Sequence, residues 1–451
     1  MKKQSILLFF IPGLVALLTA FIPPARQYPA EPFALSDKVK AERDAKALQI
    51  PQGYLQHLRW DLLLDSVGKN GSLITWKSGN PTYISDKGKL LKRSPRGSTK
   101  VKVQMTATIH AGRERRTRIF EALVAPEEQQ YAGYLFAYFE AFGETGQREQ
   151  LRFGVSADAT NWYALNNNQP VLASSSISQT GGIRDPHILR GEDEKSFFMV
   201  ATDMFTFKNG WDHNPGIVLL KSGDLVNWSH GIVDLEKSYP QKFRNVKWVW
   251  APQTIYDPAA GKYLVYFTVR LKDDPALDFY CAYANREFTA FESEPQLMFK
   301  AKYGAIDGDI IYKGGLYHFF YKGNTKNESG KEIRNGIQQA TGKTLQGPWK
   351  EDFQYLDAYA AQNIPVEGSG IFKLNNLDEF VLMYDMYKDH RYEFQRSTDL
   401  FRFTPKPESF TKNFNPRHGT VMSITREEAK RLHEKWGGVP AELLQGTPAK
   451  R

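Results

Sequence analysis

Short runs of apolar residues, each only long enough for one β-strand, recur along most of this 451-residue chain. In VKVQMTATI, apolar and polar positions alternate, which places Val101, Met105 and Ile109 on one face of a strand. Later segments such as QTIYDPAAGKYLVYFTV and DIIYKGGLYHFFYKG join two apolar runs through a turn rich in Gly, Pro or Asp. This pattern predicts an all-β protein.

A turn centred on Ser or Thr, followed by an aromatic residue, repeats roughly every 60 residues between positions 156 and 403. The five copies are SADATNW, SGDLVNW, ANREFTAF, ATGKTLQGPW and STDLFRF. A period of this length, built from about four strands, is typical of propeller blades. We therefore predict a five-bladed β-propeller over residues 127–430, with ligands bound at one mouth of its central axis.

The flanking segments differ in composition from the repeats. Residues 1–22 begin with Lys2 and Lys3 and continue into a 17-residue apolar run, which predicts a signal peptide and a secreted or periplasmic protein. An uncleaved membrane anchor is the alternative. Residues 23–48 are expected to form a linker with a short helix near its end, residues 49–126 a small Ig-like β-sandwich, and residues 431–451 a C-terminal tail.

Charge and cysteine content narrow the classes of function. The net charge is +9, but Lys and Arg are spread along the chain and no nucleic-acid-binding motif is found, so we expect no nucleic-acid partner. Cys281 is the only cysteine, which excludes an intramolecular disulfide.

Three acidic residues stand at the start of predicted blades: Asp185 in GGIRDPHILR, Asp307 in AIDGDIIY and Glu367 in PVEGSGIF. Any one of them alone fits an ordinary turn. Three like charges at one mouth of a channel repel one another, which favours a functional role for the set. A protonated carboxyl and an ionised one are the groups that hydrolysis of a glycosidic bond requires, and a third carboxylate raises the pKa of the acid.

The corresponding segment of a fourth blade is WAPQTIY. Here Trp250 is a candidate to stack on a sugar ring, and Gln253 is a candidate hydrogen-bonding group. We add Arg391 to the candidate substrate-binding residues.

The motifs RDPHI, VWAPQ, AIDGDII, PVEGSGIF and PRHGTVMSIT resemble, in order and spacing, those of glycoside hydrolase family 43. The resemblance covers residues 130–425 and implies an inverting five-bladed propeller that acts on arabinose- and xylose-containing oligo- or polysaccharides. It implies that Asp185 is the general base, that Asp307 tunes and orients the acid, and that Glu367 is the general acid. It also implies that Arg184 pairs with Asp185 or with the substrate.

His418 matches a late histidine that lies near a central water or calcium ion in some family members. A structural hydrogen-bonding role for His418 is the alternative, and no cofactor is expected to be required. The segment around Trp76, with Gly71-Ser72, Ser78 and Asn80-Pro81, resembles bacterial Ig-like modules found ahead of secreted carbohydrate enzymes.

The chain departs from the family pattern at two positions, and the sequence leaves several alternatives open. Gln253 stands where the family usually has Glu, and Ser369 where Pro often follows Glu-Gly. Asp309 competes with Asp307 for the role of third carboxylate.

Retaining fructan hydrolases share the Arg-Asp-Pro motif, but this chain lacks an upstream Asn-Asp-Pro. A non-catalytic sugar-binding propeller is the other rival. The sequence decides neither the oligomeric state nor the choice between trimming ends and cutting chains.

Overall fold

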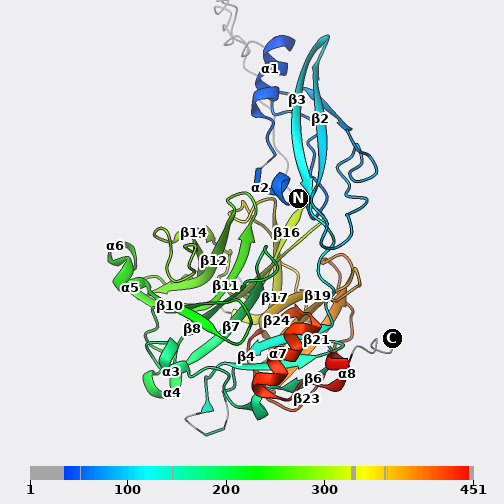
Figure 1. The fold of residues 1–451 in the computed structure, drawn as a ribbon. Helices are drawn as coiled ribbons and strands as arrows, with labels where there is room; N and C mark the ends of the chain where they lie inside the picture. The colour runs from blue at the N-terminus through cyan, green and yellow to red at the C-terminus, as the bar shows by residue number, and fades with distance from the viewer. Residues whose placement is uncertain are drawn as a thin grey trace, which may run out of the picture.

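The computed structural model describes residues 35–50, 52–141, 143–144, 147–326, 332–359, 362 and 364–445. Strands dominate the described part of the chain and gather into six sheets (Figure 1). The predicted all-β class is therefore confirmed. The predicted signal peptide, residues 1–22, lies outside the described residues.

The N-terminal module is a single sheet with helices beside it. Strands β1 (Leu73–Ser78), β2 (Val101–Ala111) and β3 (Glu114–Val124) pair antiparallel in the order β1-β2-β3. The alternation predicted for β2 is confirmed, because its apolar side chains from position 103 onward are buried.

The second layer of this module is helical. Helices α1 (Asp37–Ala47) and α2 (Gln52–Gln56) pack on β3, and α1 also contacts β2. The buried carboxylate of Asp44 accepts hydrogen bonds from the backbone N–H groups of Asn70 and Ser72, at 2.8 and 3.0 Å. Among the described residues, this module therefore has one three-stranded sheet, and the last part of the expected linker packs on it.

Five further sheets follow. Four of them contain β7 to β10, β11 to β14, β15 to β18 and β19 to β22, and the fifth has the order β23-β6-β5-β4-β24. Their bounds are β4 (Gly133–Tyr138), β5 (Arg152–Ser156), β6 (Asn161–Ala164), β7 (Ile183–Arg190), β8 (Phe197–Asp203), β9 (Gly216–Ser222), β10 (Trp228–Asp234), β11 (Val246–Asp257), β12 (Lys262–Leu271), β13 (Asp278–Tyr283), β14 (Gln296–Phe299), β15 (Ala305–Lys313), β16 (Leu316–Lys326), β17 (Glu332–Gly342), β18 (Lys350–Asp352), β19 (Glu367–Lys373), β20 (Phe380–Met386), β21 (Arg391–Ser397), β22 (Glu408–Ser409), β23 (Thr411–Lys412) and β24 (Thr420–Ile424).

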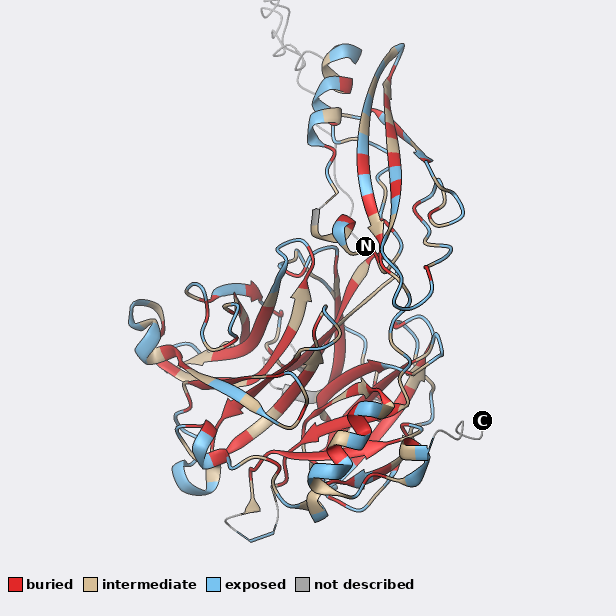
Figure 2. Cartoon of the chain, in the orientation of Figure 1, coloured by how far each residue is buried: buried red, intermediate tan, exposed pale blue. Residues whose placement is uncertain are grey.

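The strands β7, β11, β15, β19 and β24 contact one another in that order, and β24 also contacts β7. These five strands, which we call the inner strands, are largely buried (Figure 2). Side chains tie them together: Asp309 accepts from the backbone N–H of Ile371 at 2.8 Å, and Thr420 accepts from that of Ile188 at 2.9 Å. Each tie satisfies a buried backbone donor that the sheet itself leaves free.

The repeated turn of the sequence connects the third and fourth strands of a sheet. In the first copy, Asp158 accepts from the backbone N–H groups of Thr160 and Asn161, both at 2.8 Å, and the indole of Trp162 donates to the carbonyl of Ala159. Asp224 and Asp399 make the same pair of contacts in their own turns. The sequence repeat therefore reflects a structural repeat.

Short helices lie in the connections: α3 (Ser174–Ile177), α4 (Thr206–Asn209), α5 (Leu235–Ser238), α6 (Pro240–Phe243) and the 3-10 turn η2 (Asn166–Asn168). At the C-terminus, α7 (Arg426–Trp436) and α8 (Ala441–Gln445) bury Leu432 and Leu443 in one cluster with β4 and β5. The expected C-terminal tail is thus folded as far as residue 445. Within the described residues, every helix is too short or too polar to cross a membrane.

Candidate active site

Four of the five inner strands carry a β-bulge at the same level. In each, two residues of the inner strand lie opposite one residue of its partner, between Arg184 and His187, Trp250 and Gln253, Ile306 and Asp309, and Glu367 and Gly370. Inside each bulge one residue has a positive φ: Asp185 (50°), Ala251 (45°), Asp307 (53°) and Gly368 (65°). A bulge redirects side chains, and positive φ at residues other than glycine concentrates at functional sites.

The bulges correct one prediction about the three acids. Asp185 and Asp307 occupy equivalent positions, but Glu367 precedes its bulge residue, Gly368, and therefore matches Arg184 and Trp250 instead. All three acids nevertheless line one cavity of about 410 Å³, which we call the acidic cavity.

A buried histidine joins two of these acids. Nδ1 of His418 lies 3.4 Å from an oxygen of Asp185 and 3.8 Å from an oxygen of Asp307. Burial would lower the pKa of His418, but Asp307, Asp185 and Glu367 outweigh it and raise that pKa to about 9. The imidazole is therefore a cation near neutral pH.

The same contacts act in the opposite direction on Asp185. Burial would raise the pKa of this carboxyl, but His418, the charge of Arg184 and a 2.9 Å hydrogen bond from Thr202 lower it. Asp185 is thus held as a carboxylate against its burial.

The pKa of Asp307 shifts in the opposite direction to that of Asp185. Burial, together with the negative charges of Glu367 and Asp185, raises the pKa of Asp307 to about 6, although His418 and Lys322 act against the shift. Two positions close to Glu367 hold Asp307 in place: the backbone N–H of Gly368 donates to its carboxylate at 3.1 Å, and Ser369 donates to its carbonyl. Ser369, one of the two departures from the family pattern, thus contacts an acid of the cavity.

Glu367 contacts two cations that the sequence analysis did not single out. Nζ of Lys322 lies 2.9 Å from one carboxylate oxygen, and Arg417 lies 3.7 Å from the other. Lys322 comes from β16, the strand paired with the inner strand β15. Its side chain, only 13% exposed, lies beside Glu367 and Asp307, both of which raise its pKa.

A fourth acid, Asp385, also lines the acidic cavity and was missed. It is the cross-strand partner of Glu367, and its carboxylate accepts a 2.6 Å hydrogen bond from Arg417. Burial raises the pKa of Asp385 to about 7, and its other oxygen has no hydrogen-bond partner among the described residues. A single charged residue in an otherwise apolar strand, as in FFYKG and FVLMYDM, is the signal that could have identified both Lys322 and Asp385.

Aromatic side chains form part of the cavity wall. Trp250 lines the cavity and stacks on Trp248, with ring centroids 4.2 Å apart and planes at 13°. Arg184 also lines the cavity, but its ion pair is with the buried Glu149, at 2.6 Å, and its guanidinium lies over the ring of Trp211 at 4.9 Å. The expected pairing of Arg184 with Asp185 is therefore absent from the described contacts, although its charge does act on Asp185.

Three predicted residues lie outside the acidic cavity. Gln253 is fully buried in β11, and neither polar atom of its side-chain amide has a hydrogen-bond partner among the described residues. Arg391 is half exposed and pairs with Glu393 at 3.0 Å and with Asp389 at 3.5 Å. Asp309 lines a different cavity, so the geometry favours Asp307 over Asp309 as the third carboxylate.

A calcium ion near His418 stays a prediction. Among the described residues, no group of three or more His, Cys, Asp or Glu side chains is arranged so that it could hold a metal ion. The positive charge between Asp185 and Asp307 comes from His418 itself.

Comparisons with known proteins agree with the division of the chain into a small module and a larger set of sheets. Residues 129–430 match a family model of glycoside hydrolase 43 relatives, described as "Probable glycosyl hydrolase domain". Residues 41–127 match the model "Atrophied bacterial Ig domain".

An alpha-L-arabinofuranosidase from Bifidobacterium longum subsp. longum is 27% identical over 403 residues, covering 77% of this chain and 37% of that protein. The chain thus spans little more than a third of the length of this curated relative. A thermostable family-43 glycoside hydrolase has a TM-score of 0.43 at 11% identity, covering 70% of this chain and 92% of its own. An alpha-L-arabinanase from Cellvibrio cellulosa, solved with arabinohexaose, has a TM-score of 0.41 at 14% identity, covering 60% and 89%.

Proposed function

The chain belongs, through residues 129–430, to the family-43-related glycosyl hydrolases, and we propose that it is an exported inverting enzyme that removes arabinofuranosyl or xylosyl residues from plant cell-wall polysaccharides. One observation carries the proposal. Asp185, Asp307 and Glu367 line one cavity, in which a cationic histidine keeps Asp185 ionised while burial and like charge raise the pKa of Asp307. The reaction needs an ionised carboxyl as base and a protonated carboxyl as acid, and this cavity holds Asp185 as a carboxylate with Glu367 and Asp307 close to it.

In the proposed reaction, Asp185 takes a proton from a water molecule as the water oxygen attacks the anomeric carbon. The bond from that carbon to the leaving oxygen breaks, and Glu367 gives its proton to the leaving oxygen. The products are a free sugar of inverted configuration and the shortened glycan. The enzyme returns to its starting state when the proton on Asp185 is passed through solvent to Glu367.

Two carboxyls of the acidic cavity compete for the role of proton donor. Lys322 and Arg417 contact Glu367, whereas the pKa of Asp307 is about 6. The motif assigns proton donation to Glu367, and the raised pKa of Asp307 makes Asp307 the rival donor. Substitution of each acid separates the two assignments, as described in the Discussion.

Buried polar atoms without partners support ligand binding in the acidic cavity. Among the described residues, the indole nitrogen of Trp250, one oxygen of Asp385 and both nitrogens of His418 are buried and make no hydrogen bond. Such groups are costly unless water or a ligand satisfies them. Sugar hydroxyl groups can both donate and accept, which suits this mixture of donors and acceptors.

We further propose that the five sheets are the five blades of a closed propeller, over residues 127–430, and that residues 49–126 act as an Ig-like module that offers no catalytic group. The contacts of each inner strand with the next, and of β24 with β7, support closure. Secretion or export to the periplasm rests on the apolar segment at residues 6–22.

The similarity to an alpha-L-arabinofuranosidase supports arabinofuranose as the first sugar to test, with xylose second. The test measures nitrophenol release from nitrophenyl α-L-arabinofuranoside and β-D-xyloside, and follows the first anomer formed by proton NMR. An inverted anomer supports the proposal, and the faster glycoside identifies the sugar. A retained anomer would move the enzyme to the retaining class. No hydrolysis of either glycoside, or of arabinan and arabinoxylan, would favour the sugar-binding alternative.

A further inference from the structure

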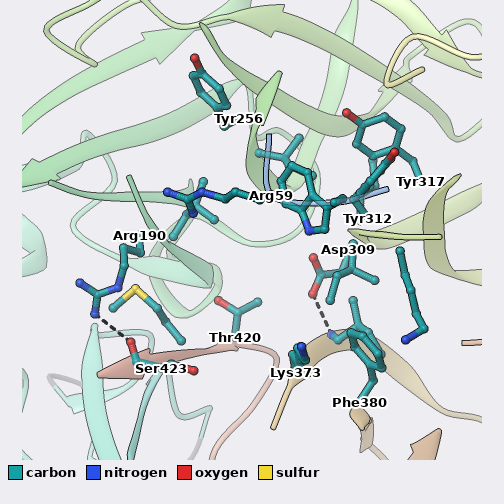
Figure 3. A pocket seen from close by; sticks show the side chains of 18 of the residues that line it. Arg59, Arg190, Tyr256, Asp309, Tyr312, Tyr317, Lys373, Phe380, Thr420 and Ser423 are labelled. Atoms are coloured by element: carbon teal, nitrogen blue, oxygen red, sulfur yellow. Dashed lines mark hydrogen bonds between the residues drawn. The ribbon is translucent and has the colours of Figure 1, made fainter. Parts of the chain in front are cut away.

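A second cavity, of about 570 Å³, lies where the N-terminal module meets the C-terminal ends of the inner strands (Figure 3). We call it the junction cavity. It shares no lining residue with the acidic cavity. Trp60 comes from the module, Tyr256 and Tyr312 come from the ends of β11 and β15, and Asp309 and Thr420 come from the inner strands.

Aromatic rings form one wall of the junction cavity. Trp60 meets Tyr312 edge to face, with ring centroids 5.0 Å apart, and Tyr312 meets Tyr317 in the same manner at 4.9 Å. Trp60, Tyr256 and Tyr312 are only partly buried, although all three line the cavity. The indole N–H of Trp60 and the hydroxyl groups of Tyr256 and Tyr312 make no hydrogen bond to other described residues, so they are free for a ligand.

The floor of the junction cavity is polar. Nδ1 of His187 accepts from the backbone N–H of Thr254 at 3.3 Å, and burial lowers the pKa of His187 to about 3, so the neutral ring carries its hydrogen on Nε2. That nitrogen lies 3.8 Å from Oδ1 of Asp309, which is too far for a hydrogen bond. Both groups are at least nine-tenths buried and line the cavity, so each keeps unused hydrogen-bonding capacity there.

The charges around the junction cavity are already matched within the protein. The lining cations and their acidic neighbours are Arg190 and Glu428 at 2.6 Å, Arg59 and Glu194 at 3.3 Å, Lys313 and Asp378 at 2.9 Å, and Lys373 and the same Asp378 at 4.0 Å. A phosphate or carboxylate would have to displace one of these acids. A neutral ligand with many hydroxyl groups and apolar faces fits the aromatic wall and the polar floor without that cost.

We propose that the junction cavity is a second glycan site, which binds a neutral saccharide between Trp60 of the module and the aromatic ends of β11 and β15. Sugar rings would lie against Trp60, Tyr256 and Tyr312, with hydroxyl groups directed to the floor at His187 and Asp309. The N-terminal module then completes a binding site and is more than a spacer. The choice of arabinan and arabinoxylan as probes rests on the proposed function, but binding in this cavity does not require hydrolysis.

The test is affinity electrophoresis through native gels that contain soluble arabinan or wheat-type arabinoxylan, with all variants carried in a full-length Asp185→Asn background. Trp60→Ala and Tyr256→Ala should each raise the apparent Kd for the polysaccharide about tenfold, or about 1.4 kcal/mol of binding free energy. In the active protein, the same two substitutions should leave hydrolysis of the nitrophenyl glycoside within twofold.

Two controls keep the outcome interpretable. Trp76→Ala removes a module tryptophan that does not line the junction cavity, and it should leave retardation unchanged. Tyr256→Phe keeps the ring and loses the hydroxyl group, so it should weaken binding without the instability of a truncated side chain.

The inference is overturned if the protein is not retarded by either polysaccharide, or if retardation survives both alanine variants and is lost in Trp250→Ala, since all binding would then occur in the acidic cavity. Retardation that depends on Trp60 in a protein that hydrolyses nothing would support the second site while removing the proposed function.

Discussion

Nδ1 of His418 lies 3.4 Å from Oδ1 of Asp185, so a buried imidazolium contacts the proposed base directly. The two groups shift each other's pKa in opposite directions, because each stabilises the charged form of its neighbour. The positive charge of His418 therefore helps to keep Asp185 ionised in the acidic cavity.

Substitution of His418 by Gln should therefore move the acidic limb of the pH dependence of kcat/KM upward by about one pH unit, because the nearby positive charge that lowers the pKa of Asp185 is lost. The measurement is a pH–rate profile on an activated glycoside. His230→Gln, at an exposed position of β10, should leave the profile unchanged. An unshifted acidic limb in His418→Gln would show that the imidazole does not control the base.

Asp185→Asn should reduce kcat/KM by about a thousandfold on every glycoside, whatever its leaving group, because an amide cannot take the proton of the attacking water. Nitrophenyl and unactivated arabinosides should be compared side by side. Near-normal rates would remove Asp185 from the reaction.

Glu367→Gln should slow glycosides with poor leaving groups by about a hundredfold or more and affect dinitrophenyl glycosides far less, since a good leaving group needs little help from an acid. Asp307→Asn should slow both kinds of substrate to a similar extent. If Asp307→Asn shows the dependence on leaving group and Glu367→Gln does not, the proton donor is Asp307.

Gly368→Ala should abolish most activity and lower the Tm. The residue has φ +65°, and an added Cβ would lie 3.1 Å from the side chain of His418. The backbone strain alone costs about 1–2 kcal/mol, and the imidazole would be displaced from the two acids. Gly370→Ala, two residues further along β19, would meet the flexible end of Met383 and should be tolerated. Equal effects of both variants would show that the loss reflects general disruption of β19.

Asp309→Asn should raise thermal stability at pH 8 and have little effect at pH 4. Burial raises the pKa of Asp309 in the folded protein to about 7, well above that of an exposed aspartate, so the folded protein holds a proton that the unfolded chain releases. Stability from this group is therefore present at low pH and lost as pH rises through about 7. Asn keeps an acceptor for the backbone N–H of Ile371 and does not ionise.

Asp399→Asn is a control in which the change in stability should have the opposite sign. Hydrogen bonds from the backbone N–H groups of Arg402 and Phe401 lower the pKa of Asp399. That variant should lose stability at pH 8. Hydrolysis by Asp309→Asn should stay close to normal, and a large loss would return Asp309 to the reaction.

The sequence predicted what depends on local pattern. Strand alternation, the repeated turn and the three acids at the blade starts can all be identified from neighbouring residues. A lone charge in an apolar strand distinguishes Lys322 and Asp385 in the sequence, but only the pairing of second strands with inner strands brings them to the cavity. Gln253 was predicted to bind substrate, and Asp309 was left as an alternative to Asp307, because the bulge has no reliable signature in one sequence. The bulge turns the residues that follow it toward the other face of the strand.

The sheet that contains β4, β5 and β6 is completed by strand β24, whose residues 420–424 pair with residues 133–137 of β4. During synthesis, the inner edge of β4 therefore has no partner until residues 420–424 have been made. Arg417 and His418 directly precede β24. The acidic cavity is therefore completed when β24 pairs with β4. The acidic cavity therefore acquires its cationic histidine only after all the other inner strands have been made.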